Sequence, residues 1–403
     1  MKYEDYVDLK HRPAKDDLVC EFHVEPLGIS LKKAAGAVAA EGSIGTWTET
    51  TTKPYVEKLA AKVFSMRGNE IKISYPIELF EPGNMPNILS SVAGNVFGLE
   101  DLKNLRLNDI IFPKNILKSF KGPKYGIDGI RKILKARKRA LLGTIIKPKI
   151  GLRTEDHVKV AYNAWMGGCD IVKDDENLSS QSFNKFEGRV KKTLEARDEA
   201  ENATGERKVY MANITAETNE MIKRAKFIED CGGEYAMVDI ITLGWSSLQT
   251  LRNQDFNLIL HGHRAGHAAL TKNPKHGIAM KVIAKVARVI GIDQLHVGAA
   301  VGKMFENKIE VLENLSAVKN KLDDIKPIMP VASGGLHPRL VPEVIKIFGN
   351  DVVIQAGGGI HGLGTKTGAA AMRQAVDATM KNIDLQDYAK SHKELASALK
   401  KWS

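Results

Sequence analysis

The sequence predicts an α/β protein built around a (β/α)8 TIM barrel, and three observations carry this prediction. From about residue 141 onward, eight short apolar runs alternate with segments of helical periodicity. These eight units occupy about 260 residues, close to the usual length of such a barrel. No Gly-x-Gly-x-x-Gly motif follows the first run, which disfavours the alternative, an open doubly wound sheet.

The predicted strands are short and end in polar residues or glycines. In chain order they are Thr144–Lys149, Asp170–Lys173, Val209–Ile214, Tyr235–Ile241, Leu258–His263, Gln294–Val297, Ile328–Ala332 and Val352–Ala356. Helical periodicity predicts helices at Glu155–Met166, Glu217–Ile228, Ile278–Ile290 and Pro342–Phe348. Because the carboxyl ends of barrel strands meet at one rim, we expect the functional residues at that rim.

The first part of the chain has a different pattern. Alternating strands mixed with helical segments at Leu31–Ala40 and Tyr55–Phe64 predict a separate α+β domain of ferredoxin-like type over residues 1–121. Lys121-Gly122-Pro123 has the composition of a linker, and a helix at Ile127–Arg137 is expected to open the barrel domain, residues 122–403.

Composition excludes several classes of protein. With 43% hydrophobic and 27% charged residues, the 403-residue chain has the composition of an ordinary globular protein. No apolar stretch is long enough for a membrane span and the polar N-terminus does not resemble a secretory signal, so we expect a cytoplasmic protein without a membrane partner. Three cysteines without C-x-x-C spacing argue against a disulfide framework and a zinc ribbon.

The net charge of +11 favours an anionic partner. Nucleic acid, a membrane surface and a phosphorylated metabolite all meet that description. Basic residues cluster at 131–139 and 189–192, but no arginine tract with interleaved aromatic residues is present, so we expect no nucleic-acid partner.

Lys173-Asp174-Asp175-Glu176-Asn177 is the most informative segment of the chain. It continues an apolar run that predicts a buried strand, on which side chains alternate between the two faces. Lys173 and Asp175 should therefore point one way and Asp174 the other, with Glu176 just past the strand. Two carboxylates and one amine could then meet at one hard cation such as Mg²⁺. A solvated charged turn is the alternative for this segment taken alone.

Lysines and histidines follow two further predicted strands. In Ile146-Lys147-Pro148-Lys149 the proline is out of place inside a central strand, and the spacing would turn both lysines into the barrel mouth. Residues 261–267 hold three histidines and an arginine. A His-x-His pair can bind zinc, so a metal-dependent hydrolase is a rival interpretation. The oxygen ligands at 173–176 instead favour Mg²⁺, with histidine and arginine as substrate and phosphate contacts.

Three glycine-containing loops complete the predicted rim. In residues 296–303 two glycines bracket a small apolar loop that ends in Lys303, a composition typical of a hinged lid. Ser333-Gly334-Gly335 and Gly357-Gly358-Gly359 would bring backbone N–H groups to an anion, at the loops where such barrels commonly bind phosphate. With Arg264 and His296 as a second anion pocket, the arrangement favours a substrate phosphorylated at both ends.

Together these motifs resemble the large subunit of ribulose-1,5-bisphosphate carboxylase/oxygenase (RuBisCO). The resemblance covers nearly the whole chain. Its motifs are Lys147-Pro148-Lys149, residues 168–177, residues 261–267, Val301-Gly302-Lys303, Ser333-Gly334-Gly335 and, in the N-terminal part, residues 41–48 and 94–98.

The resemblance implies Mg²⁺-dependent carboxylation of ribulose 1,5-bisphosphate, with a competing reaction with O2. Lys173 would react with CO2 to form a carbamate, which with Asp175 and Glu176 would bind Mg²⁺. Removal of the C3 proton would give an enediolate that attacks CO2 and yields two molecules of 3-phosphoglycerate.

Roles for other residues also follow from the resemblance. Lys147 would be an acid/base, Lys149 would support it electrostatically, His263 would position hydroxyls and shuttle protons, and Lys303 would stabilise the new carboxylate. Contacts to one phosphate would come from Arg264, His296 and Ser333. Contacts to the other would come from Thr46, Trp47, Lys303, Gly335, Gly357 and Gly358, with Gly334 in the same turn as Gly335.

The N-terminal domain of this family completes the site of a neighbouring subunit, which implies a homodimer as the minimum unit. The residues concerned are Glu41, Thr46, Trp47 and Asn95. RuBisCO-like proteins that enolise or isomerise methylthio-sugar phosphates are the alternative. Carboxylation is favoured by the presence of Lys147, Lys303, Glu41, Thr46 and Asn95. The compact length resembles archaeal form III enzymes, which act without small subunits and are associated with salvage of nucleotide ribose such as that of AMP.

Overall fold

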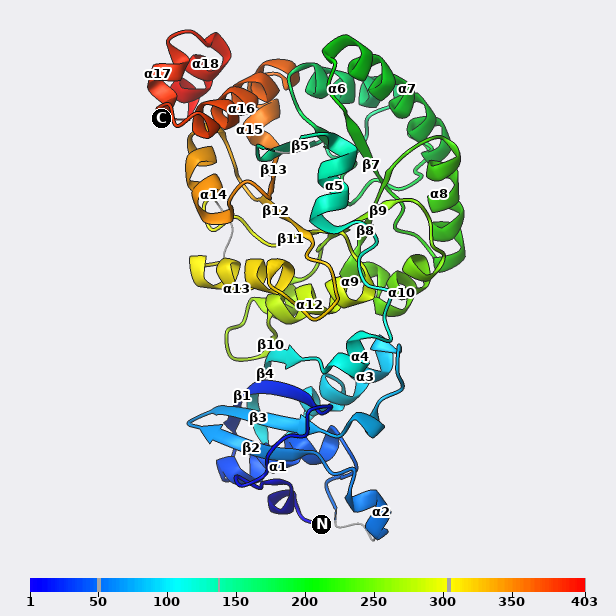
Figure 1. Cartoon of the computed structure of the whole chain (residues 1–403), viewed down its shortest axis with the longest axis vertical. Helices are drawn as coiled ribbons and strands as arrows, with labels where there is room; N and C mark the ends of the chain where they lie inside the picture. Colours follow the sequence, from blue (N-terminus) through cyan, green and yellow to red (C-terminus); the bar gives the residue numbers. More distant parts are fainter. Residues whose placement is uncertain (49–51, 137, 303–305, 403) are drawn as a thin grey trace. The chain divides into compact units, whose positions relative to one another are not determined.

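The computed structural model describes residues 1–48, 52–136, 138–302 and 306–402 (Figure 1). The chain forms two compact units. The first contains residues 1–121, 266–290 and 322–325, and the second contains residues 122–265, 291–321 and 326–403. Residues 266–290 and 322–325, which were predicted to lie in the barrel domain, thus belong to the same unit as the N-terminal residues.

The second unit is built on a closed barrel of parallel strands in the order β11-β12-β13-β5-β6-β7-β8-β9. This confirms the predicted (β/α)8 fold. The strands are β5 Leu141–Ile145, β6 Ile171–Lys173, β7 Val209–Asn213, β8 Tyr235–Asp239, β9 Ile259–His263, β11 Gln294–His296, β12 Met329–Ser333 and β13 Val353–Ala356.

The first barrel strand ends earlier than the sequence pattern predicted. The prediction placed it at Thr144–Lys149, whereas β5 pairs with β13 from Leu141 to Thr144 and ends at Ile145. The N–H of Ile146 still donates to the carbonyl oxygen of Lys173, but Pro148 has no backbone N–H to donate to a ladder, so the chain leaves the sheet after Ile146. Lys147 and Lys149 therefore lie in the loop after β5.

Helices surround the barrel (Figure 1). The longer ones in this unit are α6 Thr154–Met166, α7 Phe186–Thr204, α8 Thr218–Asp230, α10 Trp245–Asn253, α13 Lys308–Lys319, α14 Val341–Phe348, α16 Thr365–Met380 and α18 Lys393–Lys401. Short helices α9 Ile240–Leu243, α15 Gly358–His361 and α17 Leu385–Ala389 complete the set of described α-helices apart from α5. No helix in the described parts of the chain is long and apolar enough to cross a membrane.

Helix α5 (Gly126–Leu134) closes the amino-terminal end of the barrel. Its residues Ile127, Ile130 and Leu134 belong to one buried cluster with side chains from the barrel strands. Each such side chain contributes about 1.5–3 kcal/mol when it leaves water. The helix was predicted to reach Arg137 but ends at Leu134, because Lys135 adopts a left-handed conformation with φ 53°.

The first unit contains a five-stranded sheet in the order β10-β4-β1-β3-β2. Its strands are β1 Leu18–Pro26, β2 Lys62–Arg67, β3 Glu70–Tyr75, β4 Leu102–Ile111 and β10 Gly277–Ile278. β10 runs parallel to β4 and the other pairs are antiparallel, which gives a mixed sheet and confirms the predicted α+β class. The other described helices here include α1 Leu31–Glu41, α3 Met85–Val92, α4 Lys114–Leu117 and α12 Met280–Ile290.

The predicted second helix at Tyr55–Phe64 is wrong. Only Pro54–Glu57 is helical (α2), and Lys62–Arg67 forms strand β2 against β3. Pro54 starts a helix well, but Val63 is buried in the sheet and pairs with Ile73, so tertiary packing overrides the helical pattern of the later residues.

Candidate functional site

A cavity of about 850 Å³ opens at the carboxyl ends of the barrel strands. Most of its lining comes from strand ends and the loops that follow them, as the barrel fold predicts. The lining residues are Ile145, Lys147, Lys173, Glu176, His263, His296, Gly302, Ser333, Gly334, Gly335, Leu336, His337, Leu340, Gln355, Gly357, Gly358, Gly359 and Trp402.

Lys173, the last residue of β6, is fully buried in this cavity wall. Its Nζ lies 2.8 Å from the carbonyl oxygen of Asp174, 3.2 Å from Sδ of Met237 and 3.8 Å from Oε2 of Glu176. Burial lowers the pKa of the Lys173 amine, although nearby carboxylates including Glu176 and Asp175 oppose the shift. The side chain is thereby biased toward the neutral amine, the nucleophilic form of lysine.

Asp174 points away from the cavity, as the strand alternation predicted. It is fully buried and accepts a hydrogen bond from the Tyr210 hydroxyl at 2.6 Å, with Arg189 Nε at 3.2 Å and His157 Nε2 at 3.2 Å. Burial opposes ionisation, but Arg189 and His157 hold the pKa of Asp174 well below its usual range. The backbone N–H of Asn213 also donates to Asp174, so this carboxylate anchors the segment that carries Lys173 and Asp175.

Asp175 lies beside Lys147, with Oδ2 at 2.7 Å from the lysine Nζ. Oδ1 accepts hydrogen bonds from the backbone and side chain of Asn177. Burial opposes ionisation of Asp175, but the bonds from Lys147 and Asn177 lower its pKa. Lys149 differs from the prediction: it is exposed and does not line the cavity, because the chain has left the strand and the alternation of side chains no longer applies.

Three histidines lie close together in the barrel: His261 and His296 are hydrogen-bonded to each other, and the ring of His263 contacts that of His296. His263 Nδ1 lies 2.7 Å from Oδ1 of Asp239, and its Nε2 lies 3.7 Å from Oε2 of Glu176. His296 Nδ1 lies 2.7 Å from Oγ of Ser333, and its Nε2 lies 3.1 Å from Nε2 of His261. Burial lowers the pKa of both His261 and His296 well below the usual value, so these two rings are neutral near pH 7.

The geometry does not support the zinc interpretation of the His-x-His pair. Within the described residues, no group of three His, Cys, Asp or Glu side chains is placed to hold a metal ion. Neighbouring protein groups engage both nitrogens of His261, since Gln294 bonds its Nδ1. Asp175 and Glu176 supply two carboxylates beside Lys173, so this set fits a hard cation such as Mg²⁺ once Lys173 provides an oxygen ligand.

The two glycine loops contact one another directly. Gly334 and Gly335 have φ of 118° and 72°, conformations that favour glycine. A Cβ on Gly359 would lie 2.0 Å from the carbonyl oxygen of Leu336, so the turn after β12 and the loop after β13 pack backbone against backbone. Ser333, Gly357 and Gly358 also line the cavity.

Two residues that were predicted to lie at the rim, Arg264 and Lys303, are not found among the described residues that line the cavity. Arg264 is buried and forms an ion pair with Glu306 at 2.5 Å, and it does not line the cavity with His296. Lys303 lies outside the described residues.

The predicted residues of the N-terminal part belong to the first unit. Glu41 ends α1, and its Oε1 accepts a hydrogen bond from the Tyr3 hydroxyl at 3.0 Å. Thr46 is half-buried, and Trp47 is 82% exposed. Asn95 begins a short 3-10 helix, Asn95–Gly98.

Sequence reasoning missed several residues that form the cavity or orient its side chains. Asp239 ends β8 and Gln355 lies near the end of β13, so the strand-end rule could have identified both. Neither amide atom of the buried Gln355 has a hydrogen-bond partner among the described residues. His337 and Trp402 follow no strand pattern, and Trp402 reaches the cavity from a remote helix.

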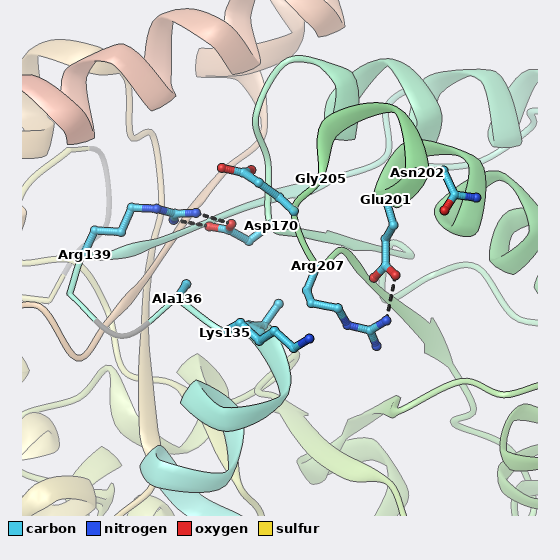
Figure 2. A pocket seen from close by; sticks show the side chains of 10 residues that line it. Lys135, Ala136, Arg139, Asp170, Glu201, Asn202, Gly205 and Arg207 are labelled. Atoms are coloured by element: carbon cyan, nitrogen blue, oxygen red, sulfur yellow. Dashed lines mark hydrogen bonds and ion pairs between the residues drawn. The ribbon is translucent and has the colours of Figure 1, made fainter.

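A second cavity, of about 420 Å³, lies near the opposite end of the barrel strands (Figure 2). Arg139 forms two 2.6 Å hydrogen bonds with the carboxylate of Asp170, which directly precedes β6. Arg207, before β7, donates to Glu201 at 2.6 Å. The charged groups of this cavity therefore largely satisfy one another.

Comparison with known families and proteins agrees with this geometry. The family model described as the ribulose bisphosphate carboxylase large chain, catalytic domain, matches residues 126–402. The corresponding N-terminal domain model matches residues 5–116.

Similar proteins span the full length of the chain. The ribulose bisphosphate carboxylase of Methanosarcina mazei is 49% identical, with 99% of both chains covered. That of Pyrococcus furiosus is 49% identical, covering 99% of this chain and 97% of the relative.

Solved structures lead to the same family. Octameric Rubisco from Pyrococcus horikoshii OT3 has a TM-score of 0.96 and 47% identity, covering 100% of this chain and 97% of that one. Dimeric archaeal Rubisco from Hyperthermus butylicus has a TM-score of 0.92 and 45% identity, covering 99% of each. The chain therefore belongs to the ribulose bisphosphate carboxylase large-chain family, a family of carboxy-lyases.

Proposed function

We propose that this protein carboxylates ribulose 1,5-bisphosphate to two molecules of 3-phosphoglycerate in a Mg²⁺-dependent reaction, with O2 as a competing co-substrate. The observation that carries the proposal is the buried amine of Lys173, 3.8 Å from Glu176 and next to Asp175 in a cavity at the barrel mouth. The names and lengths of the relatives support the same assignment.

Lys173 first has to become an oxygen ligand. Its neutral amine attacks CO2, a bond forms between Nζ and carbon, and one amine proton is released, which leaves a carbamate anion. That carbamate, Asp175 and Glu176 would hold Mg²⁺. When bound there, Mg²⁺ would supply Lewis-acid polarisation of the substrate ketone.

Side chains at and around the proposed metal ligands would transfer protons to and from the substrate. Once carbamylated, Lys173 would supply the base for the C3 proton, and its removal would give the enediolate. Lys147, whose ammonium group lies 2.7 Å from Asp175, is the acid/base for the later protonation. Asp239 orients His263 through Nδ1 and leaves Nε2 directed toward Glu176, so His263 would position substrate hydroxyls.

The glycine turns would bind one phosphate through backbone N–H groups. These turns are Gly334-Gly335 and Gly357-Gly358-Gly359. Ser333 and His296, which are joined by a 2.7 Å hydrogen bond, would contact the other phosphate. Lys149, Arg264 and Lys303 remain proposed contacts to the substrate. For Arg264 this requires release from its ion pair with Glu306.

The active assembly is proposed to be a homodimer or an oligomer of dimers without small subunits. In it Glu41, Thr46, Trp47 and Asn95 would complete the site of a neighbouring subunit. The exposure of Trp47 and the dimeric and octameric states of the similar Rubisco structures support this arrangement. A form III role in salvage of nucleotide ribose and a cytoplasmic location belong to the same proposal.

The test is incorporation of labelled bicarbonate into 3-phosphoglycerate, with ribulose 1,5-bisphosphate and Mg²⁺, without O2 and after preincubation with CO2. We expect acid-stable label that depends on all three reagents, and less product when the preincubation is omitted. Folded protein that fixes no label, yet turns over methylthio-sugar phosphates, would instead be a RuBisCO-like enolase or isomerase.

A further inference from the structure

The wall of the cavity at residues 333–337 is supported by an aromatic stack from the end of α18. Trp402, which directly follows this helix, lines the cavity. Its ring lies on that of His337 with a centroid distance of 5.0 Å and an interplanar angle of 13°. Stacked ring pairs stabilise a structure beyond the area that they bury.

Two hydrogen bonds join the same end of α18 to both glycine loops. Arg339, just after the 333–337 turn, donates from Nη2 to the carbonyl oxygen of Leu399 at 2.7 Å. The Lys401 ammonium group donates to the carbonyl oxygen of Gly362, which follows α15. Because α15 starts within the 357–359 loop, α18 is connected to the segments that follow both loops.

The two loops cannot move independently. The carbonyl oxygen of Leu336 and the Cα of His337 lie 2.0 and 3.0 Å from the position that a Cβ of Gly359 would occupy. A shift of the 333–337 turn toward this position would displace the 357–359 loop. The placement of His337 therefore affects both proposed phosphate-binding segments.

The contact between Trp402 and His337 depends on ring shape. Burial, with a smaller contribution from Arg339, lowers the pKa of His337, so its imidazole is neutral near pH 7. Nδ1 of His337 and Nε1 of Trp402 are buried and have no hydrogen-bond partner in the part of the chain that the structure describes. Flat stacking of two neutral rings is what holds this pair.

We propose that Trp402 is a positioning residue for the phosphorylated substrate. By stacking on His337 it holds the 333–337 turn, and through that turn the 357–359 loop, in the conformation that directs their backbone N–H groups to a phosphate. The identity of the ligand rests on the proposed function. Lys173, Asp175 and Glu176 come from β6 and the loop after it, so they keep their positions when the indole is removed.

The experiment compares Trp402→Ala and Trp402→Phe with Lys400→Ala, a matched control at an exposed position of the same helix. We expect Trp402→Ala to raise KM for ribulose 1,5-bisphosphate about tenfold and to leave kcat within about twofold. Trp402→Phe keeps a flat ring and should restore KM to within about threefold of the wild type. Lys400→Ala should behave as the wild type.

Titration calorimetry with ribulose 1,5-bisphosphate gives a second readout that does not require turnover, and Trp402→Ala should weaken binding by the same factor. An unchanged KM and affinity in folded Trp402→Ala would overturn the proposal, as would a fall in kcat that parallels a fall in melting temperature. If the wild type binds the bisphosphate without carboxylating it, the proposed function fails while the binding comparison still decides the role of Trp402. If the wild type does not bind it, both fail.

Discussion

The two ends of the barrel carry similar kinds of residue but use them differently. At the amino-terminal end, Arg139 forms two hydrogen bonds of 2.6 Å with Asp170 (Figure 2). Apolar side chains of α5 pack there against side chains of the barrel strands. At the carboxyl-terminal mouth, Lys173 lies 3.8 Å from Glu176, and burial favours its neutral form. Removing one partner of the buried Arg139–Asp170 pair should cost stability, whereas the Lys173 amine, 3.8 Å from Glu176, remains available for chemistry.

The largest effect should come from a substitution at the carboxyl-terminal mouth of the barrel. Lys173→Met replaces the buried amine with an apolar side chain of similar length, and we expect carboxylation to fall at least 10³-fold, about 4 kcal/mol of transition-state stabilisation. Stability should stay equal or increase, because a buried amine is costly to desolvate. The measurement is single-turnover carboxylation alongside thermal unfolding. Activity within tenfold of the wild type would refute the role of Lys173.

At the amino-terminal end we expect the opposite result, a loss of stability with little change in activity. Asp170→Asn leaves Arg139 without its bidentate partner and weakens the acceptor for the backbone N–H of Leu142. We expect a loss of about 3–5 kcal/mol in the free energy of unfolding, with kcat and KM of the folded enzyme within about twofold.

Urea unfolding and steady-state kinetics measure these two quantities. Asp198→Asn is the control, because its carboxylate pairs with Arg197 but is 61% exposed, and it should cost less than about 1 kcal/mol. Equal losses in the two variants would remove the distinction between the buried pair and the exposed one.

Asp174 is intermediate between these two cases, since it lies next to the reactive lysine but its carboxylate accepts hydrogen bonds from Tyr210, Arg189 and the backbone of Asn213. Asp174→Asn should reduce stability by about 2–4 kcal/mol and activity about tenfold, because the anchor of the 173–176 segment is weakened. If added Mg²⁺ and CO2 recover the activity but not the stability, the anchor acts on the geometry of the segment. Loss of only one of the two properties contradicts this double role.

The smallest effect is a pH dependence at the amino-terminal end. Burial opposes ionisation of Glu206, but hydrogen bonds from Arg373 and Lys208 lower its pKa to about 2. A carboxyl group with a lowered pKa stabilises the fold above its unfolded pKa of about 4.3, and this contribution is lost as the pH falls toward 2.

Because the Glu206 side chain is 38% exposed and therefore screened, we expect a contribution of about 1 kcal/mol. Unfolding of Glu206→Gln between pH 5 and 3 should show a correspondingly weaker pH dependence than the wild type. Identical slopes would mean that this pair is already screened by solvent.

The sequence predicted the barrel because its parallel strands are buried on both sides and appear as apolar runs. It also predicted that Lys173 and Asp174 point to opposite faces, which depends only on the geometry of a strand. The end of β5 was missed because it depends on pairing with β13 and β6. The length of α2 was missed because the residues after it pair with β3 as strand β2. Trp402 could not be assigned from local pattern, since its position at the cavity depends on how α18 is placed in the fold. Gln355, near the end of β13, could have been found by the strand-end rule.

The opposite directions of Lys173 and Asp174 also limit how this segment can change in length. One residue inserted between Asp170 and Lys173 would exchange the two faces, placing a carboxylate in the barrel and an amine among His157, Arg189 and Tyr210. A point substitution here alters the contacts of one side chain, whereas an insertion changes the environments of Lys173 and Asp174 together. We therefore expect insertions to be tolerated only after Asn177, in the loop that leads to α7.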